Sequence, residues 1–327
     1  MRVGRTSWRT GTLHSGPNAG RGGIELAKPK AWYGHDTGLS LRMLLTMALL
    51  ALLYAVFVFV LFRVGVGAPY LIFIVGIMLI TQLLFSDRLV LLAAHARVVN
   101  ATQAPRLFQA AERLAQMADL PMPKLAVMPA RLPNAFTTGR SPKTAVITVT
   151  DGLLNRLNDE ELEAVLAHEM THIKNRDVAV ITIASFFAMV ASLIVQQLLF
   201  FGIMAEDQRD RRGAQWIMVI WFVSLLVWAI SYVLIRMLSR YREYAADRGA
   251  AILTGHPGYL VSALSQIERG IRQTPSRDLR QAESFNAFFI FPAVSKQSVM
   301  EVFSTHPTID HRIRYLERIQ QEMNTFH

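Results

Sequence analysis

The most informative stretch of this chain is His168-Glu169-Met170-Thr171-His172, near the middle of its 327 residues. On a helix, histidines four residues apart lie on the same face, one turn above the other, so both imidazoles can reach one ion. Zinc favours imidazole nitrogen and keeps an open coordination position when only three protein ligands hold it. Glu169 lies beside that face and could take a proton from a water on the metal. The stretch therefore predicts a zinc site with its own base; the alternative is a pair of satisfied core histidines.

The sequence around this stretch predicts a helix that starts at Asn158, because Glu161 follows three residues later as in a capping box. Histidines on a buried helix would be poorly solvated unless they had a ligand or a partner. Apolar residues with helical spacing indicate such burial here, at Leu162, Val165, Leu166, Met170 and Ile173.

Other water-facing segments mix helix and strand. Residues 105–119 have helical spacing and stop before Pro121, whereas 124–127 and 144–150 are β-branched or apolar runs that predict short strands. Between the strands, residues 134–139 (Asn-Ala-Phe-Thr-Thr-Gly) predict a loop or an edge strand. The zinc helix is therefore expected within a small α+β domain.

A third zinc ligand must be His, Asp or Glu, because the chain contains no cysteine. A third histidine on the same segment is absent, since the positions of that extended motif hold Asn175 and Val178. Further on, Arg242-Glu243-Tyr244-Ala245-Ala246-Asp247 lies on a predicted helix. Glu243 could ligate zinc, and Asp247, one turn later, could orient a ligating histidine. The alternative is a plain surface cluster of ion pairs with the neighbouring arginines.

The composition indicates an integral membrane protein. Hydrophobic residues make up 52% and charged residues 18% of the chain, whereas soluble globular proteins usually carry about a quarter charged residues. Intrinsic disorder and secreted disulfide scaffolds are excluded as overall classes. Four stretches contain no charged residue and are long enough to cross the hydrocarbon core as helices: 43–62, 64–86, 178–205 and 213–235.

The order of these spans agrees with a shared metal site. His172 precedes the second pair of spans and Glu243 follows it, so one ion can join them only if residues 178–235 cross the membrane an even number of times. The third span is longer than the bilayer requires. Its start is therefore expected to continue the zinc helix out of the membrane.

Lysine and arginine residues indicate the orientation of the spans. Seven of them precede the first span, against Arg63 alone in the first hairpin loop, which places the N-terminus and both parts of the site in the cytoplasm. The arginines of the loop at 206–212 oppose this assignment. The net charge of +10 is attributed to membrane flanks, since no basic cluster with interleaved aromatic residues suggests a nucleic-acid partner.

These assignments divide the chain into five parts. A basic flexible tail is expected at 1–42, with an organelle transit peptide as the alternative. The other parts are a transmembrane hairpin at 43–86, the first part of the zinc-site domain at 87–177, a second hairpin at 178–235 and the second part of the domain at 236–327.

A further segment, Ser304-Thr305-His306-Pro307, precedes a predicted helix whose first turn suits Pro307. His306 could donate to a transition-state oxyanion, although by sequence alone a capping or surface histidine is the simpler interpretation. Residues 272–300 could form a lid or pack on the membrane surface.

From about residue 43 to its end, the chain resembles the HtpX family of membrane zinc metalloproteases, which are related to the CAAX prenyl endoproteases. The resemblance implies one Zn²⁺ per chain held by His168, His172 and Glu243, with Glu169 as general base, in a zincin-like α+β catalytic domain. It rests on several motifs in order: Asn134-Ala135-Phe136, His168–His172 followed by Asn175-Arg176-Asp177, Arg242–Asp247, and Ser304-Thr305-His306-Pro307 with Arg312-Ile313.

The resemblance also implies a function and a location. Asn134, Ala135 and Phe136 are expected to form an edge strand where an extended substrate adds by backbone pairing. The expected activity is peptide-bond hydrolysis in quality control of membrane proteins, in the bacterial inner membrane, with the active site facing the cytoplasm. Four spans rather than seven favour the HtpX branch over a CAAX-type endoprotease.

Two other classes of function are weighed. A non-catalytic, zinc-stabilised scaffold would bind the metal and hydrolyse nothing. A transporter would need polar or charged groups within its spans, and these spans contain no charge. The expected partners are membrane protein or peptide substrates and the lipid bilayer.

Overall fold

The computed structural model describes residues 37–63, 76–77, 80–81, 91–92, 94–204, 211–273 and 307–325. Several sequence predictions lie outside these residues: the tail up to residue 36, most of the span at 64–86, His306, and nearly all of 272–300.

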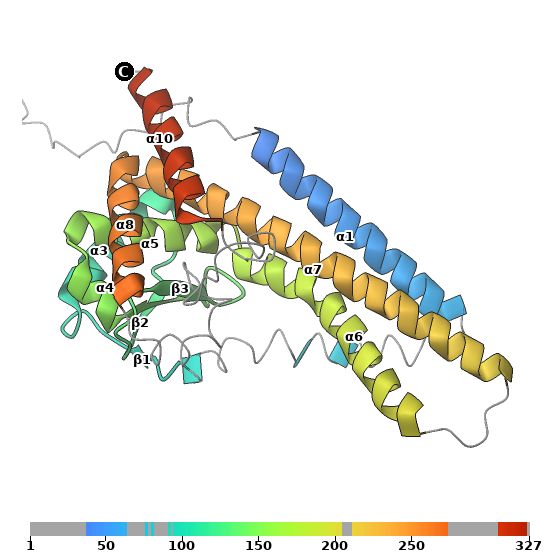
Figure 1. The fold of residues 1–327 in the computed structure, drawn as a ribbon. Helices are drawn as coiled ribbons and strands as arrows, with labels where there is room; N and C mark the ends of the chain where they lie inside the picture. The colour runs from blue at the N-terminus through green and yellow to red at the C-terminus, as the bar shows by residue number, and fades with distance from the viewer. Residues whose placement is uncertain are drawn as a thin grey trace, which may run out of the picture. The chain divides into compact units, whose positions relative to one another are not determined.

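Within the described part of the chain, three helical segments are long and apolar enough to cross a membrane. They are α1 (Thr37–Arg63), the segment Asp177–Gln196 of α6 (Asp177–Met204), and the segment Trp216–Thr254 of α7 (Arg211–Thr254). Three of the four expected spans are therefore helices, and the count of four is not established. The three helices run alongside one another (Figure 1), and α1 includes residues 37–42 of the segment expected as a tail.

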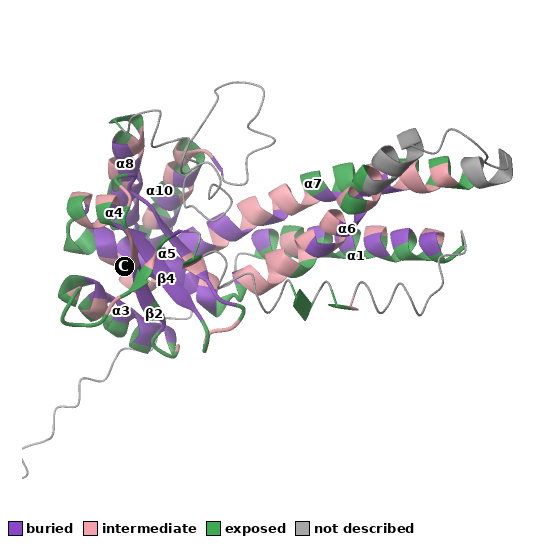
Figure 2. Cartoon of the chain, turned by 90° about the horizontal axis from the view of Figure 1, so that it is seen from below, coloured by how far each residue is buried: buried purple, intermediate pink, exposed green. Residues whose placement is uncertain are grey.

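The three helices contact one another through buried apolar side chains. Phe57 of α1, Phe186 of α6 and Leu238 of α7 belong to one cluster, and the Tyr54 hydroxyl donates a 2.6 Å hydrogen bond to the carbonyl oxygen of Ala184. Away from this cluster, large apolar side chains of the same helices stay exposed, as the green and pink stretches of α1 and α7 in Figure 2 show. Such surfaces suit helices that are solvated by lipid.

A four-stranded mixed sheet confirms the α+β prediction for the water-facing part. The strand order is β1-β2-β4-β3, so β3 is an edge strand, which decides between the loop and the edge strand expected at 134–139. β2 and β4 are parallel, whereas β1 and β3 pair antiparallel with their neighbours. The strands are β1 (Arg97–Val98), β2 (Lys124–Met128), β3 (Ala135–Thr138) and β4 (Val146–Thr150).

The described residues form five further helices, of which α4 and α5 contact the sheet and α10 packs on α7 and α8 (Figure 1). The segment predicted at 105–119 is a helix with an apolar buried face. These helices are α3 (Pro105–Ala118), α4 (Asp151–Arg156), α5 (Asp159–Lys174), α8 (Pro257–Gln273) and α10 (Ile309–Thr325). α5 is the most deeply buried of them, and it contacts both β3 and α7.

The start of α5 confirms the predicted capping box. The Asn158 side chain accepts a hydrogen bond from the Glu161 backbone N–H at 2.8 Å, and the Glu161 carboxylate accepts one from the Asn158 backbone N–H at 3.1 Å. These two bonds satisfy N–H groups that a helix start leaves without partners.

The end of α5 corrects the expectation that the third span simply continues the zinc helix. α5 ends at Lys174 and α6 begins at Asp177. Between them, Arg176 has a left-handed backbone with φ of 55°, which interrupts the helical path and lets α6 leave in another direction (Figure 1). The break places Asp177 beside the end of α5.

α7 is one continuous helix of 44 residues, so the same helix carries a membrane span and the Arg242–Asp247 segment. It approaches α5 closely at Gly249. A Cβ atom on Gly249 would lie 2.3 Å from Cγ2 of Thr171, well inside van der Waals contact. The missing side chain therefore lets α7 bring Glu243 within reach of the histidines on α5.

Candidate metal centre

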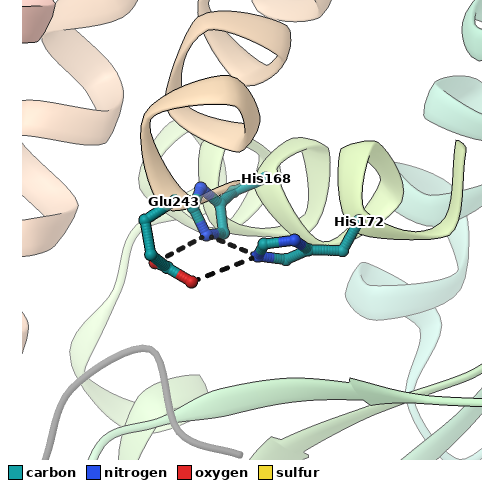
Figure 3. A group of neighbouring side chains, drawn as sticks. All are labelled: His168, His172 and Glu243. Carbon is teal, nitrogen blue, oxygen red and sulfur yellow. Dashed lines mark hydrogen bonds and ion pairs between the residues drawn. The ribbon is translucent and has the colours of Figure 1, made fainter. Parts of the chain in front are cut away.

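His168 and His172 of α5 point toward Glu243 of α7 (Figure 3). The two Nε2 atoms are 3.1 Å apart. The Glu243 carboxylate lies 3.6 Å from each of them, through Oε2 to His168 and through Oε1 to His172. One possible ligand atom from each of the three residues thus lies within 4.8 Å of the other two.

The donor set fits a zinc ion. Ligand atoms about 2.0–2.1 Å from zinc in a tetrahedron lie roughly 3.3 Å from each other, close to the separations observed here. Two nitrogens and one carboxylate also leave one coordination position for a reactant, as in catalytic zinc sites.

Carboxylates hold the far side of each imidazole ring. His168 Nδ1 lies 3.1 Å from Oδ1 of Asp247, and His172 Nδ1 lies 2.5 Å from Oδ2 of Asp177. Because a carboxylate only accepts, each Nδ1 carries a hydrogen, which leaves Nε2 as the atom that can bind a metal when the ring is neutral. Asp247 lies where the sequence analysis expected an orienting carboxylate.

Asp177 was not assigned to the site from the sequence. It is the first residue of α6, and it also forms an ion pair with Arg242, the residue before Glu243. Both side chains are buried. An acid placed just beyond the end of the histidine helix is the signal that could have identified it.

Arg312 of α10 is a second residue that the sequence analysis did not assign. Its fully buried guanidinium donates to Asp247 through Nε at 2.9 Å and Nη2 at 2.5 Å. Its Nη1 lies 3.3 Å from Oε2 of Glu243. Burial opposes the charge, but the carboxylates of Asp247 and Glu243 outweigh that effect and raise the pKa of Arg312 above its usual range.

The position of Arg312 on α10 is the feature that could have identified it as a site residue. An arginine occupies a core position on an amphipathic helix, which is uncommon without a charged partner. The buried residues of α10 are Arg312, Leu316, Ile319 and Met323.

The two histidines differ in proton affinity in the metal-free cluster. Burial lowers the pKa of His168, but its hydrogen bonds to Asp247 and Glu243 raise it overall to about 9. Burial and the neighbouring charge on His168 lower the pKa of His172 to about 4. At neutral pH, the metal-free cluster therefore holds one imidazolium, on His168.

Glu169 lies next to the cluster and faces the edge strand. Its side chain is buried, and Oε2 accepts a 2.6 Å hydrogen bond from the Thr137 hydroxyl of β3. Glu169, the base expected from the sequence, is thus close to His168 and His172 on α5 and to β3, the strand at the edge of the sheet.

Asn134, Ala135 and Phe136 are all buried. The Asn134 side chain accepts a 2.9 Å hydrogen bond from the Ala135 backbone N–H, and the Asn134 backbone pairs with Thr150. These side chains therefore support the edge strand from inside, and contact with a substrate falls to the backbone. His306 lies outside the described residues.

The chain is similar in sequence to known proteins. Residues 101–320 match the model of Peptidase family M48. A "Protease HtpX homolog" from Moorella thermoacetica is 55% identical over 290 residues, which are 89% of this chain and 97% of that protein. A "Protease HtpX homolog 2" from Methanosarcina mazei is 48% identical over 295 residues, 90% of this chain and 100% of that protein.

The fold is also similar to a solved structure. The crystal structure of Ste24p from S. mikatae superimposes with a TM-score of 0.52 and 18% sequence identity, and the match covers 86% of this chain and 65% of that one. At this identity, the likeness shows a common fold.

Proposed function

The chain belongs to peptidase family M48 and, within it, to the HtpX proteases, so it is a membrane-bound metalloprotease, and we propose that the cluster on α5 and α7 is its active site. The observation that carries this proposal is the convergence of three donor atoms from His168, His172 and Glu243. Each imidazole is held by a carboxylate on its other nitrogen, as in other zinc sites.

His168, His172 and Glu243 would hold Zn²⁺, which this family uses. Asp247 and Asp177 would fix the two rings in the tautomer that presents Nε2 to the metal. Arg312 would balance the negative charge of Asp247 and Glu243, whose two carboxylates lie in the same buried volume. Bound zinc would supply a Lewis acid that polarises the scissile carbonyl.

Glu169 would act as general base and then as general acid. Its carboxylate would take a proton from the attacking water and pass it to the leaving amine. Its burial beside the cluster excludes bulk water from this transfer. His306 is the proposed donor to the developing oxyanion.

An extended substrate segment would lie along the open edge of β3. Among the described residues, β3 pairs with β4 on one side and with no strand on the other, and such edges accept peptides by backbone hydrogen bonding. Membrane proteins are the proposed substrates, in quality control; three helices of the described chain that are long and apolar enough to cross a bilayer support this proposal. The lysine and arginine distribution supports a cytoplasmic site in the bacterial inner membrane.

The direct test compares wild type with Glu169→Gln, each purified in detergent under a chelator and then supplied with zinc. We expect zinc-dependent cleavage of casein, and self-cleavage, from wild type only. Zinc content measured on both proteins is the control, because the variant keeps all three proposed ligands. Equal cleavage by the variant would contradict the role of Glu169, and tight zinc binding without cleavage by either protein would favour a scaffold.

A further inference from the structure

One side chain connects the edge strand to the proposed base. The Thr137 hydroxyl lies 2.6 Å from Oε2 of Glu169 and 3.4 Å from the Glu169 carbonyl oxygen. A hydroxyl has a single hydrogen, so the short contact identifies the carboxylate as its acceptor. Among the described residues, no other side chain donates a hydrogen bond to this carboxylate.

The backbone of the same residue faces the open edge of the sheet. The Thr150 N–H donates to the Asn134 carbonyl at 2.9 Å, so Asn134 directs its backbone groups toward β4. In an antiparallel pair this direction alternates along the strand. Phe136 therefore also faces β4, whereas Ala135 and Thr137 direct their N–H and C=O groups away from it.

We propose that Thr137 is a positioning residue for catalysis: its hydroxyl fixes the orientation of the Glu169 carboxylate while its backbone pairs with the substrate. This inference rests on the proposed function of Glu169 and of the β3 edge. One residue then aligns the base and the peptide, because its side chain and its backbone belong to the same short strand.

The geometry explains why a single hydrogen bond has this effect. A carboxylate side chain of Glu has several rotamers, and a base must hold its oxygen within hydrogen-bond reach of the attacking water. Binding Oε2 to Thr137 leaves Oε1 available for that water. Orientation of a base by a third group is a recurring feature of such sites.

The chain provides a matched control in the next residue. Thr138 has the same side chain on the same strand, is buried where Thr137 is half-buried, and makes no hydrogen bond through its hydroxyl within the described part of the chain. Valine keeps the shape and the β-branching of threonine and removes only the hydroxyl. Thr137→Val and Thr138→Val therefore impose the same chemical change with and without the link to Glu169.

The experiment uses the full-length zinc-loaded protein in detergent and one peptide substrate. We expect Thr137→Val to lower kcat by roughly tenfold, the size expected for losing one hydrogen bond to a charged group, with KM within about twofold of wild type. Thr137→Ser should restore most of kcat, and Thr138→Val should change neither constant. Zinc affinity, measured by competition with a chromophoric chelator, should be the same in all four proteins.

Wild-type kcat in Thr137→Val would overturn the inference. So would an equal loss in Thr138→Val, or a parallel loss of zinc affinity, since both would indicate damage to the strand and not to the base. Glu169→Gln in the same assay separates the two proposals. If Glu169→Gln is inactive while Thr137→Val is fully active, only the positioning role fails; if Glu169→Gln is active, the proposed function fails.

Discussion

The two halves of α7 reverse the usual relation between polarity and burial. In the N-terminal half, Trp216 is 55% and Met218 is 71% exposed, although both are large and apolar. In the C-terminal half, Glu243 is 5% and Asp247 is 0% exposed, although both are charged. In a soluble protein each half would be unfavourable. The first half is explained by lipid as its solvent, and the second by the buried partners His168 and Arg312.

The comparison predicts that the C-terminal half depends on charge balance. Arg312→Met should lower the free energy of unfolding of the metal-free protein by about 3–5 kcal/mol, because Asp247 and Glu243 would stay buried without the guanidinium that pairs with them. Chemical unfolding in detergent under a chelator measures this. Arg314→Met is the control, since Arg314 is exposed on the same helix. Equal stability of the two variants would contradict the assigned role of Arg312.

A smaller effect is expected at the junction between the site and the membrane helices. Asp177→Ala should weaken zinc binding by about 10- to 100-fold, because His172 loses the carboxylate that orients its ring. Competition with a chelator of known affinity measures it. Asp159→Ala is the matched control, as Asp159 is an exposed acid at the start of α5 that pairs only with the exposed Arg106. Unchanged affinity in Asp177→Ala would show that His172 is held by the helix alone.

The cluster should also bind zinc more tightly as the pH rises. With its pKa at about 9, His168 carries a proton at neutral pH that zinc must displace, while His172, with its pKa at about 4, carries none. Zinc affinity should therefore rise about tenfold per pH unit between roughly pH 6 and 9 and level off above. Titration with zinc at several pH values, corrected for buffer and chelator protonation, measures this slope. An affinity that is flat from pH 6 to 8 would show that His168 is not protonated in the metal-free protein.

The smallest effect is expected on the lipid-facing half. Leu226→Ala should change the free energy of unfolding in detergent by no more than about 0.5 kcal/mol, because this side chain is exposed. Leu238→Ala, in the buried cluster of the same helix, should cost about 2–5 kcal/mol. A large loss in Leu226→Ala would indicate that this face is covered by protein and not by lipid.

Local patterns in the sequence were sufficient for the elements whose cause is local. Asn158 and Glu161 define the start of α5 because capping involves residues three apart, and His168 and His172 share a face because the helix repeat places them there. Glu243 could be predicted for a different reason. It follows the second pair of expected spans and lies among charged neighbours in a segment with a helical pattern.

The remaining features depend on contacts between distant segments. Asp247 and Arg312 are separated by 65 residues, and Thr137 and Glu169 by 32, so no short pattern relates them. The left-handed backbone at Arg176 is also hard to predict, because arginine is a common helix residue, although Asn175 before it is favoured at helix ends. β1, with two residues, is too short to show a periodicity.

The dependence of Asp247 and Glu243 on Arg312 also has a consequence for biosynthesis. A ribosome makes the chain from α5 through α6 and α7 to α10, so both acids exist before their cation does. Until α10 docks, Asp247 and Glu243 lack the guanidinium that pairs with them in the folded protein. The candidate metal centre is therefore incomplete until the last helix of the described chain has been made, after the membrane helices that precede it.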